Sequence, residues 1–387
     1  MRRVGSFREN KAPLPERIKE ARLSRGFSIT DLAKELGITR QAVSRYELDE
    51  INPSPVILDK LSEILRFPLS FFTKETKQSS IAHGTTFFRS LKSADSDVRD
   101  MIKIRAKWTE EVFGELDQYL KFPQVDLPDI EHLIEKDELI LDDMEEIALA
   151  VRKSWGLGLG PISNMALLLE KKGFIISGAM TGHKETDACS QKRGSRPFVF
   201  LGKDKKSASR SRFNLAHELG HILLHQYIDD EQLKDISILN RVEKEANMFA
   251  STFLLPRDSF ANEVMSLSLE HFITLKKRWK VSIAAMIYRC QELELFTANQ
   301  VLYLRKQMST RKWNRQEPLD DEIPPETPIL LKTAITMILE KNVKTANDLL
   351  DIFMWTSQDL EEICELPEGT LNTQQAQVIT IDFKKFK

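Results

Sequence analysis

The side chains best suited to metal binding and catalysis lie in the segment 213–221, which reads Phe-Asn-Leu-Ala-His-Glu-Leu-Gly-His. Residues four apart share one helix face at roughly 6 Å, so His217 and His221 could bind one Zn²⁺ together. Glu218 would lie near the metal without being a first ligand. It could take a proton from the attacking water as the general base of hydrolysis. The alternative is an amphipathic helix that carries two histidines by chance.

A carboxylate from a later helix is expected to supply the third ligand. Residues 241–256 carry apolar side chains at helical spacing. Glu243 and Asn247 share a face of this helix, so Glu243 could bind the metal while Asn247 contacts a ligating histidine. Glu245 lies about 200° round the helix from Glu243 and is expected to point elsewhere, so Glu243 is the predicted ligand and Glu245 the fallback. Both glutamates could instead be ordinary solvated carboxylates.

A third histidine follows on the same predicted helix. His225 lies eight residues after His217, about 12 Å along a helix axis. One ion cannot be bound at about 2.1 Å by both of these side chains. We therefore expect His225 to pack in the core or to contact a ligand rather than the metal.

With these residues in place, the chain resembles the ImmA/IrrE metallopeptidases. The resemblance rests on residues 217–221, 243–250 and 254–256 and covers about half of the chain. It implies a small thermolysin-like zincin core. It also implies cleavage of a DNA-binding regulator, often a mobile-element or stress-response repressor. Further positions that match are Trp155, Gly156, Pro161, Ile162, Gly173, Asp187, Ala188, Ser190, Arg212 and Phe213 upstream, and Lys276, Trp279, Ser282, Ala285, Trp313, Glu317 and Pro318 downstream.

Cys189 departs from that resemblance, because a large apolar residue is expected after Asp187 and Ala188. A thiolate at this position could occupy the open zinc position and leave on oxidation. The alternative is a thiol packed in the core.

Residues 13–74 predict five short helices. The second, at about 28–36, ends at Gly37, which makes a tight turn. Thr39 could cap the third helix, at 40–48. A helix, a short turn with glycine and a second helix with polar N-terminal residues are typical of a helix-turn-helix.

Residues 31–47 resemble the Xre/Cro-type repressor domain. The resemblance implies that Arg40, Gln41, Ser44 and Arg45 point into the major groove of double-stranded DNA. Arg and Gln make bidentate contacts to guanine and adenine. Ile29 stands where many relatives carry a phosphate-contacting glutamine, which would weaken DNA binding. The alternative is a helical docking domain that pairs with another such repressor.

Composition is ordinary for a globular protein, with 41% hydrophobic and 29% charged residues. The 387 residues suffice for two or three domains. The net charge of −2 gives no global bias toward nucleic acid, but residues 1–74 hold 14 Lys and Arg against 10 Asp and Glu. Residues 317–387 hold 6 against 14. This asymmetry fits a DNA-facing N-terminal region and a different partner at the other end.

Three cysteines without a CxxC pair favour a reducing, cytoplasmic location. No apolar stretch follows Met1 as in a signal peptide, and no apolar run reaches about 18 residues. We therefore expect no membrane association.

The fold class predicted is mainly α with a small α+β zincin core. An all-α helix-turn-helix domain at 1–74 is followed by a helical connector at 75–138, whose apolar stripe could be an interdomain or dimer contact. The peptidase domain is expected at 139–304, with strands at 174–177 and 197–201 whose sheet edge could bind an extended substrate. A linker at 305–328 and a helical region of unknown role at 329–387, with a strand at 378–381, would complete the chain.

These features predict a DNA-binding regulator fused to a zinc endopeptidase that cleaves a cognate repressor. A stress, mobile-element, toxin–antitoxin or phage-defence circuit would suit such a protein. The alternative is a non-proteolytic transcription factor whose zincin-like domain acts as a sensor or scaffold. Expected partners are double-stranded DNA and a protein substrate, and a homodimer is left open.

Overall fold

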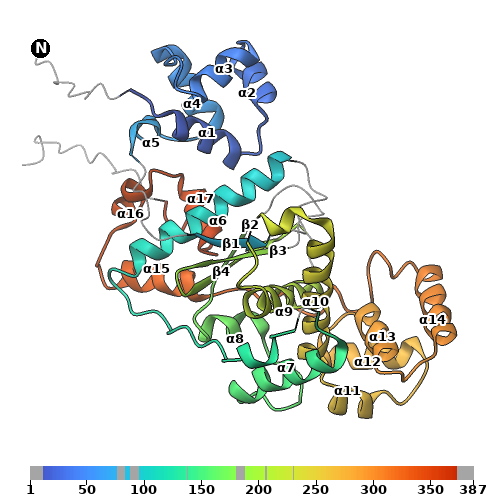
Figure 1. Cartoon of the computed structure of the whole chain (residues 1–387). Coiled ribbons are helices and arrows are strands. Elements are labelled where there is room, and N and C mark those ends of the chain that lie inside the picture. The colour runs from blue at the N-terminus through green and yellow to red at the C-terminus, as the bar shows by residue number, and fades with distance from the viewer. Residues whose placement is uncertain are drawn as a thin grey trace, which may run out of the picture.

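The computed structural model describes residues 12–75, 83–87, 96–136, 138–179, 188–204, 207–229 and 231–372. Helices dominate, and one small sheet lies between them (Figure 1). Asp187 and the strand expected at 378–381 lie outside the described residues. Within the described ranges, no helix combines the length and the apolar content that a membrane crossing requires.

The N-terminal domain consists of the five predicted helices. They are α1 (Pro15–Ser24), α2 (Ile29–Leu36), α3 (Arg40–Glu47), α4 (Pro55–Leu65) and α5 (Leu69–Thr73). The Ser28 hydroxyl accepts a hydrogen bond from the Asp31 backbone and caps α2, and Thr39 caps α3 in the same way. Gly37 ends α2 at a φ of 68°, a left-handed conformation that glycine adopts without strain.

The sheet has four strands in the order β1-β3-β4-β2. They are β1 (His83–Phe87), β2 (Ile175–Ala179), β3 (Ala188–Arg193) and β4 (Arg196–Gly202). β2 and β4 are parallel, whereas β3 runs antiparallel to both β4 and β1. The two apolar strands β2 and β4 were predicted, but β3 was missed because it reads Ala-Cys-Ser-Gln-Lys-Arg and lacks the β-branched and aromatic residues typical of strands.

The two faces of the sheet pack against different helices (Figure 1). Ala188 and Leu201 join the main core, whereas Cys189 and Phe200 pack with helix α6 (Ser96–Leu116). The main core also contains α7 (Leu141–Ser154), α8 (Met165–Lys171), α9 (Ala208–Leu224), α10 (Ile236–Leu254), α11 (Arg257–Glu263), α12 (Leu269–Trp279), α13 (Ile283–Glu292) and α14 (Ala298–Thr310). Two short 3-10 helices, η2 (Glu131–Leu133) and η3 (Gln232–Lys234), lie in the connections.

The segment at 75–138 does more than connect two domains. It supplies β1, which pairs with β3, and α6, whose Trp108, Val112 and Leu116 are fully buried within the chain. The apolar stripe of α6 is therefore an internal packing face. The boundaries of the domains stay predictions, but the core of the peptidase region draws on residues before 139.

The segment at 305–328 is also packed rather than a free spacer. The ammonium group of Lys276 is fully buried and lies 2.8 Å from Glu317 and 2.7 Å from Asp320. Glu326 forms a buried ion pair with Arg212 of α9. Buried charges need such partners, so the acidic residues of this segment tie it to α9 and α12.

The C-terminal helices connect the N-terminal domain to the sheet. They are α15 (Leu330–Glu340), α16 (Ala346–Phe353) and α17 (Ser357–Ile363). Their apolar side chains share one buried cluster with α1–α6 and with Ile175 and Phe198 of the sheet. Within it, Trp108 of α6 stacks on Trp355 with ring centroids 4.6 Å apart. The helix-turn-helix domain is therefore packed against the rest of the protein.

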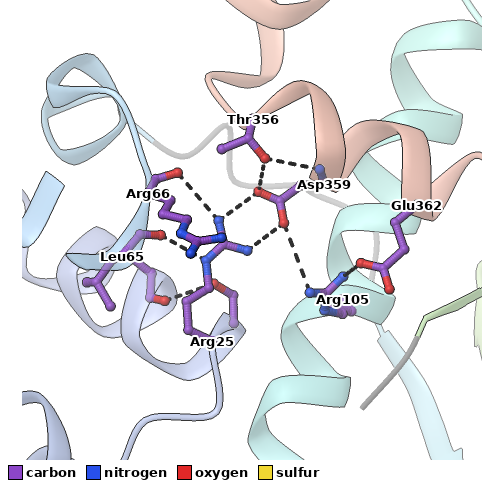
Figure 2. A network of polar contacts seen from close by, with 9 residues as sticks. Arg25, Leu65, Arg66, Arg105, Thr356, Asp359 and Glu362 are labelled. Atoms are coloured by element: carbon purple, nitrogen blue, oxygen red, sulfur yellow. Dashed lines mark hydrogen bonds and ion pairs between the residues drawn. The ribbon is translucent and has the colours of Figure 1, made fainter. Parts of the chain in front are cut away.

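A polar network fixes this packing (Figure 2). The guanidinium group of Arg25, at the end of α1, donates to both carboxylate oxygens of Asp359 at 2.5 and 2.8 Å. Asp359 is buried and also accepts from the Thr356 hydroxyl. Arg105 of α6 lies 4.0 Å from Asp359 and 2.7 Å from Glu362. Burial raises the pKa of Asp359, but Arg25 outweighs this effect and leaves the pKa below its ordinary value.

Replacing Asp359 by Ala is expected to lower the free energy of unfolding by about 3 kcal/mol, because Arg25 and Arg105 lose their shared carboxylate. Urea unfolding, followed by the fluorescence of the tryptophans, which include Trp108 and Trp355, would measure this loss of stability. The matched control is Asp100→Ala, which breaks an exposed pair with Lys103 and should cost less than about 1 kcal/mol. Equal losses in both variants would contradict a stabilising role for the buried pair.

Candidate metal centre

Two packed helices, α9 and α10, bring the candidate ligands together. Gly220 of α9 lies close to α10, where an added Cβ would be 3.3 Å from the Cα of Ala246 and 3.2 Å from the ring of Phe249. A larger residue would push the helices apart. The glycine therefore lets Glu243, one turn before Ala246, reach the two histidines of α9.

Three side chains converge at this contact. His217 Nε2 and His221 Nε2 are 3.0 Å apart, and each lies 3.3 Å from one carboxylate oxygen of Glu243. Ligand atoms bound at 2.0–2.1 Å around a tetrahedral Zn²⁺ would be about 3.3 Å apart. Among the described residues, this is the group of histidine and carboxylate side chains that could hold a metal ion. The donor set and its spacing fit zinc.

His217 is oriented by Asn247. The two side chains are joined by a hydrogen bond of 3.1 Å between His217 Nδ1 and Asn247 Oδ1. Because the amide oxygen accepts, we assign a hydrogen to Nδ1, so the neutral ring would bind a metal through Nε2, the atom that faces Glu243. Asn247 thus lies beside a candidate ligand.

His221 is held from behind by a second buried pair. Its Nδ1 lies 3.0 Å from His225 Nδ1, and His225 Nε2 lies 3.0 Å from Glu245 Oε2. The other oxygen of Glu245 accepts from the Leu139 backbone at 3.3 Å. His225 and Glu245 are not part of the group formed by His217, His221 and Glu243. Sequence reasoning missed that they contact each other, because nothing in their spacing indicates a pair from two helices.

Burial and the carboxylates set the charges of the site. Burial lowers the pKa of His221 to about 3 and also lowers the pKa of His225, so both imidazoles are neutral near pH 7. Burial raises the pKa of Glu243, but its close contacts with His217 and His221 outweigh this effect and leave the pKa below the ordinary value. Burial also opposes a charge on His217, yet Glu243 and Glu218 leave its pKa above the ordinary value.

Glu218 is buried next to His217 on α9, and its charge acts on both His217 and Cys189. Cys189 itself is packed against α6 with Phe200 and is not part of the ligand group. Burial, and then the charge of Glu218, raises the pKa of the Cys189 thiol. The packing and the raised pKa favour a core thiol over a thiolate at the metal position.

The four residues predicted to contact DNA all lie on α3. Arg40, Gln41 and Arg45 are exposed, and Ser44 is half-buried. The opposite face of α3 buries Val43 and Tyr46 in the domain core. Arg45 forms an ion pair of 3.1 Å with Glu50, in which both side chains are about half exposed. Ile29 is partly buried against the core rather than free on the surface.

Comparisons with known proteins agree with both resemblances. A helix-turn-helix family model matches residues 18–72. The model of an M78 peptidase family, described as the IrrE N-terminal-like domain, matches residues 175–291. A prophage SPbeta-derived uncharacterized HTH-type transcriptional regulator, YonR of Bacillus subtilis (strain 168), is 43% identical over 61 residues. That match covers 16% of this chain and 56% of the relative, so the chain spans about half of YonR. The chain thus carries an Xre-type helix-turn-helix domain and an IrrE N-terminal-like domain.

Proposed function

We propose that this chain, which joins a helix-turn-helix domain to an IrrE N-terminal-like domain, is a zinc-dependent endopeptidase that cleaves a DNA-binding regulator. The observation that carries the proposal is the convergence of His217, His221 and Glu243 at 3.0–3.3 Å. Three protein ligands leave a fourth position free, which is typical of catalytic zinc sites, whereas structural sites are closed by four protein ligands.

The side chains of the site would then have distinct roles. When bound, zinc would polarise the scissile carbonyl and lower the pKa of a water toward about 7. Glu218 would accept the proton of the attacking water and pass it to the leaving amine. Asn247 would keep His217 oriented through its hydrogen bond to Nδ1. Two neutral imidazoles and one carboxylate would leave the loaded site with a single positive charge, which suits a developing oxyanion.

The side of β3 that faces away from β4 is occupied, because the edge strands of the sheet are β1 and β2. β1 pairs antiparallel with β3 and fills that edge. An extended substrate could add there only if β1 left, because each strand edge offers one row of backbone hydrogen bonds. We therefore do not assign substrate binding to that edge.

The N-terminal domain is proposed to bind double-stranded DNA through α3. Replacing Arg40 by Ala is expected to weaken binding about 5- to 150-fold, as for loss of one bidentate base contact. Fluorescence anisotropy with duplexes selected by the wild-type protein from a random pool would measure the change at fixed salt. The matched control is Lys60→Ala, which removes an exposed positive charge from α4. Similar weakening in both variants would argue against base reading by α3.

The packed N-terminal domain favours a second candidate function. Arg25 and Asp359 hold that domain against the C-terminal helices, which contact the sheet. A ligand or partner at the zincin-like domain could change DNA binding through this contact without any cleavage. A non-proteolytic transcription factor would keep its regulation after loss of Glu218, whereas a protease-dependent regulator would not.

A further inference from the structure

His225 and Glu245 lie behind His221, on the side away from Glu243. Both are buried, with 2% and 5% of their surface exposed, so water does not satisfy their polar atoms. Hydrogen bonds join Glu245 to His225 and His225 to His221, each at 3.0 Å. These two residues have no role in the proposed mechanism. Burying a histidine–glutamate pair lowers the stability of the fold unless the pair is fully hydrogen-bonded.

We assign a direction to both hydrogen bonds in the series Glu245–His225–His221. An ionised carboxylate only accepts, so His225 Nε2 carries a hydrogen and donates it to Glu245. The neutral ring of His225 then has a lone pair on Nδ1 and must accept there. His221 Nδ1 is therefore the donor of the 3.0 Å contact. His221 is left with its lone pair on Nε2, the atom 3.3 Å from Glu243.

We propose that Glu245 and His225 are positioning residues that fix His221 in the tautomer whose Nε2 can bind the metal. This inference rests on the proposed zinc site. Outer partners of metal ligands commonly fix the tautomer and the ring orientation of a histidine directly. Here the carboxylate acts through an intervening histidine, so Glu245 controls a ligand that it does not touch.

The two hydrogen bonds that join Glu245 to His225 and His225 to His221 are called the relay below. Replacing Glu245 by Gln tests this relay with almost no change in the shape of the side chain. The Leu139 backbone needs an acceptor, so the amide oxygen should stay at the position of Oε1. The amide NH₂ would then face His225 and donate to its Nε2. His225 would in turn donate from Nδ1 to His221, which would place a hydrogen on His221 Nε2. The whole chain of hydrogen bonds reverses, and the metal-binding lone pair is lost.

The expected result is zinc affinity about 10- to 100-fold weaker in Glu245→Gln than in the wild type, the loss typical for outer partners of metal ligands. A competition titration of the full-length protein with a chromophoric chelator would measure it. The matched control is Glu170→Gln, in which a buried carboxylate outside the ligand group, one that accepts backbone hydrogen bonds from Ile329 and Leu330, is changed. Burial raises the pKa of Glu170 to about 7, so its neutral form is tolerated and zinc affinity should not change.

Two variants of His225 separate positioning from packing. His225→Gln keeps a carbonyl that can accept from His221 Nδ1, whereas His225→Phe keeps a ring of similar size without an acceptor. We expect partial retention of zinc affinity in the first variant and a larger loss in the second. Equal losses would indicate packing alone and would overturn the proposal.

The tautomer itself can be read without zinc. Long-range ¹H–¹⁵N spectra of metal-free protein with labelled histidine should show His221 protonated on Nδ1 in the wild type and on Nε2 in Glu245→Gln. The same tautomer and the same zinc affinity in both proteins would overturn the relay and leave the zinc site standing. Failure of the wild type to bind zinc would contradict the proposed function, while these spectra would still decide the relay.

Discussion

Replacing Glu218 by Gln is expected to abolish peptide cleavage while zinc stays bound. The amide has the size of the carboxylate but cannot accept the proton of the attacking water, and general-base catalysis contributes about 10²- to 10⁴-fold. The three candidate ligands do not include Glu218, so zinc content should equal that of the wild type. The measurement pairs kcat/KM on the cognate substrate with metal analysis of the same sample.

An exposed carboxylate provides the control for this prediction. Glu231 is largely exposed and pairs with Lys234, so Glu231→Gln should leave both cleavage and zinc content unchanged. Full activity of Glu218→Gln would remove Glu218 from the mechanism. Loss of zinc from that variant would instead place Glu218 among the groups that hold the metal.

Replacing Glu243 by Ala is expected to remove zinc and activity together. Glu243 is the one carboxylate among the three candidate ligands and lies 3.3 Å from both histidines. Its loss should therefore exceed the 10- to 100-fold weakening typical of an outer partner. A chelator competition titration measures the affinity, and activity should also disappear from wild-type protein on chelation and return with added zinc.

Glu245→Ala distinguishes the two glutamates of α10. If Glu243 is the third ligand, Glu243→Ala should lose more zinc affinity than Glu245→Ala, which acts only through His225 and His221. The reverse order would make Glu245 the ligand and would contradict the arrangement seen in the structure.

Local signals in the sequence predicted much of the fold. The hydroxyl cap of Thr39 and the turn at Gly37 are local features, so the order and the approximate bounds of the helices in the helix-turn-helix could be predicted. The spacing of His217 and His221 predicted one helix face, and the position of Glu243 relative to Asn247 predicted the second. Helical periodicity and capping act within a few residues, which is why a sequence reveals them.

Contacts between distant segments could not be predicted in this way. Arg25 and Asp359 are 334 positions apart, and neither residue type indicates a buried partner. β3 is held by its neighbours rather than by strand propensity, and the packing of residues 317–326 depends on Lys276 and Arg212. The hydrogen bonds of His225 and Glu245 likewise form only when α9 meets α10. Long-range packing decided each of these features.

The central claim is that the chain cuts a DNA-binding regulator with the zinc site of α9 and α10. The most direct test compares newly formed protein N-termini in host cells that carry either the wild type or Glu218→Ala, with and without DNA damage. The claim predicts a new terminus in one DNA-binding regulator with the wild type and none with the variant. Identical termini under every condition, with zinc bound to both proteins, would contradict it and favour the non-proteolytic transcription factor.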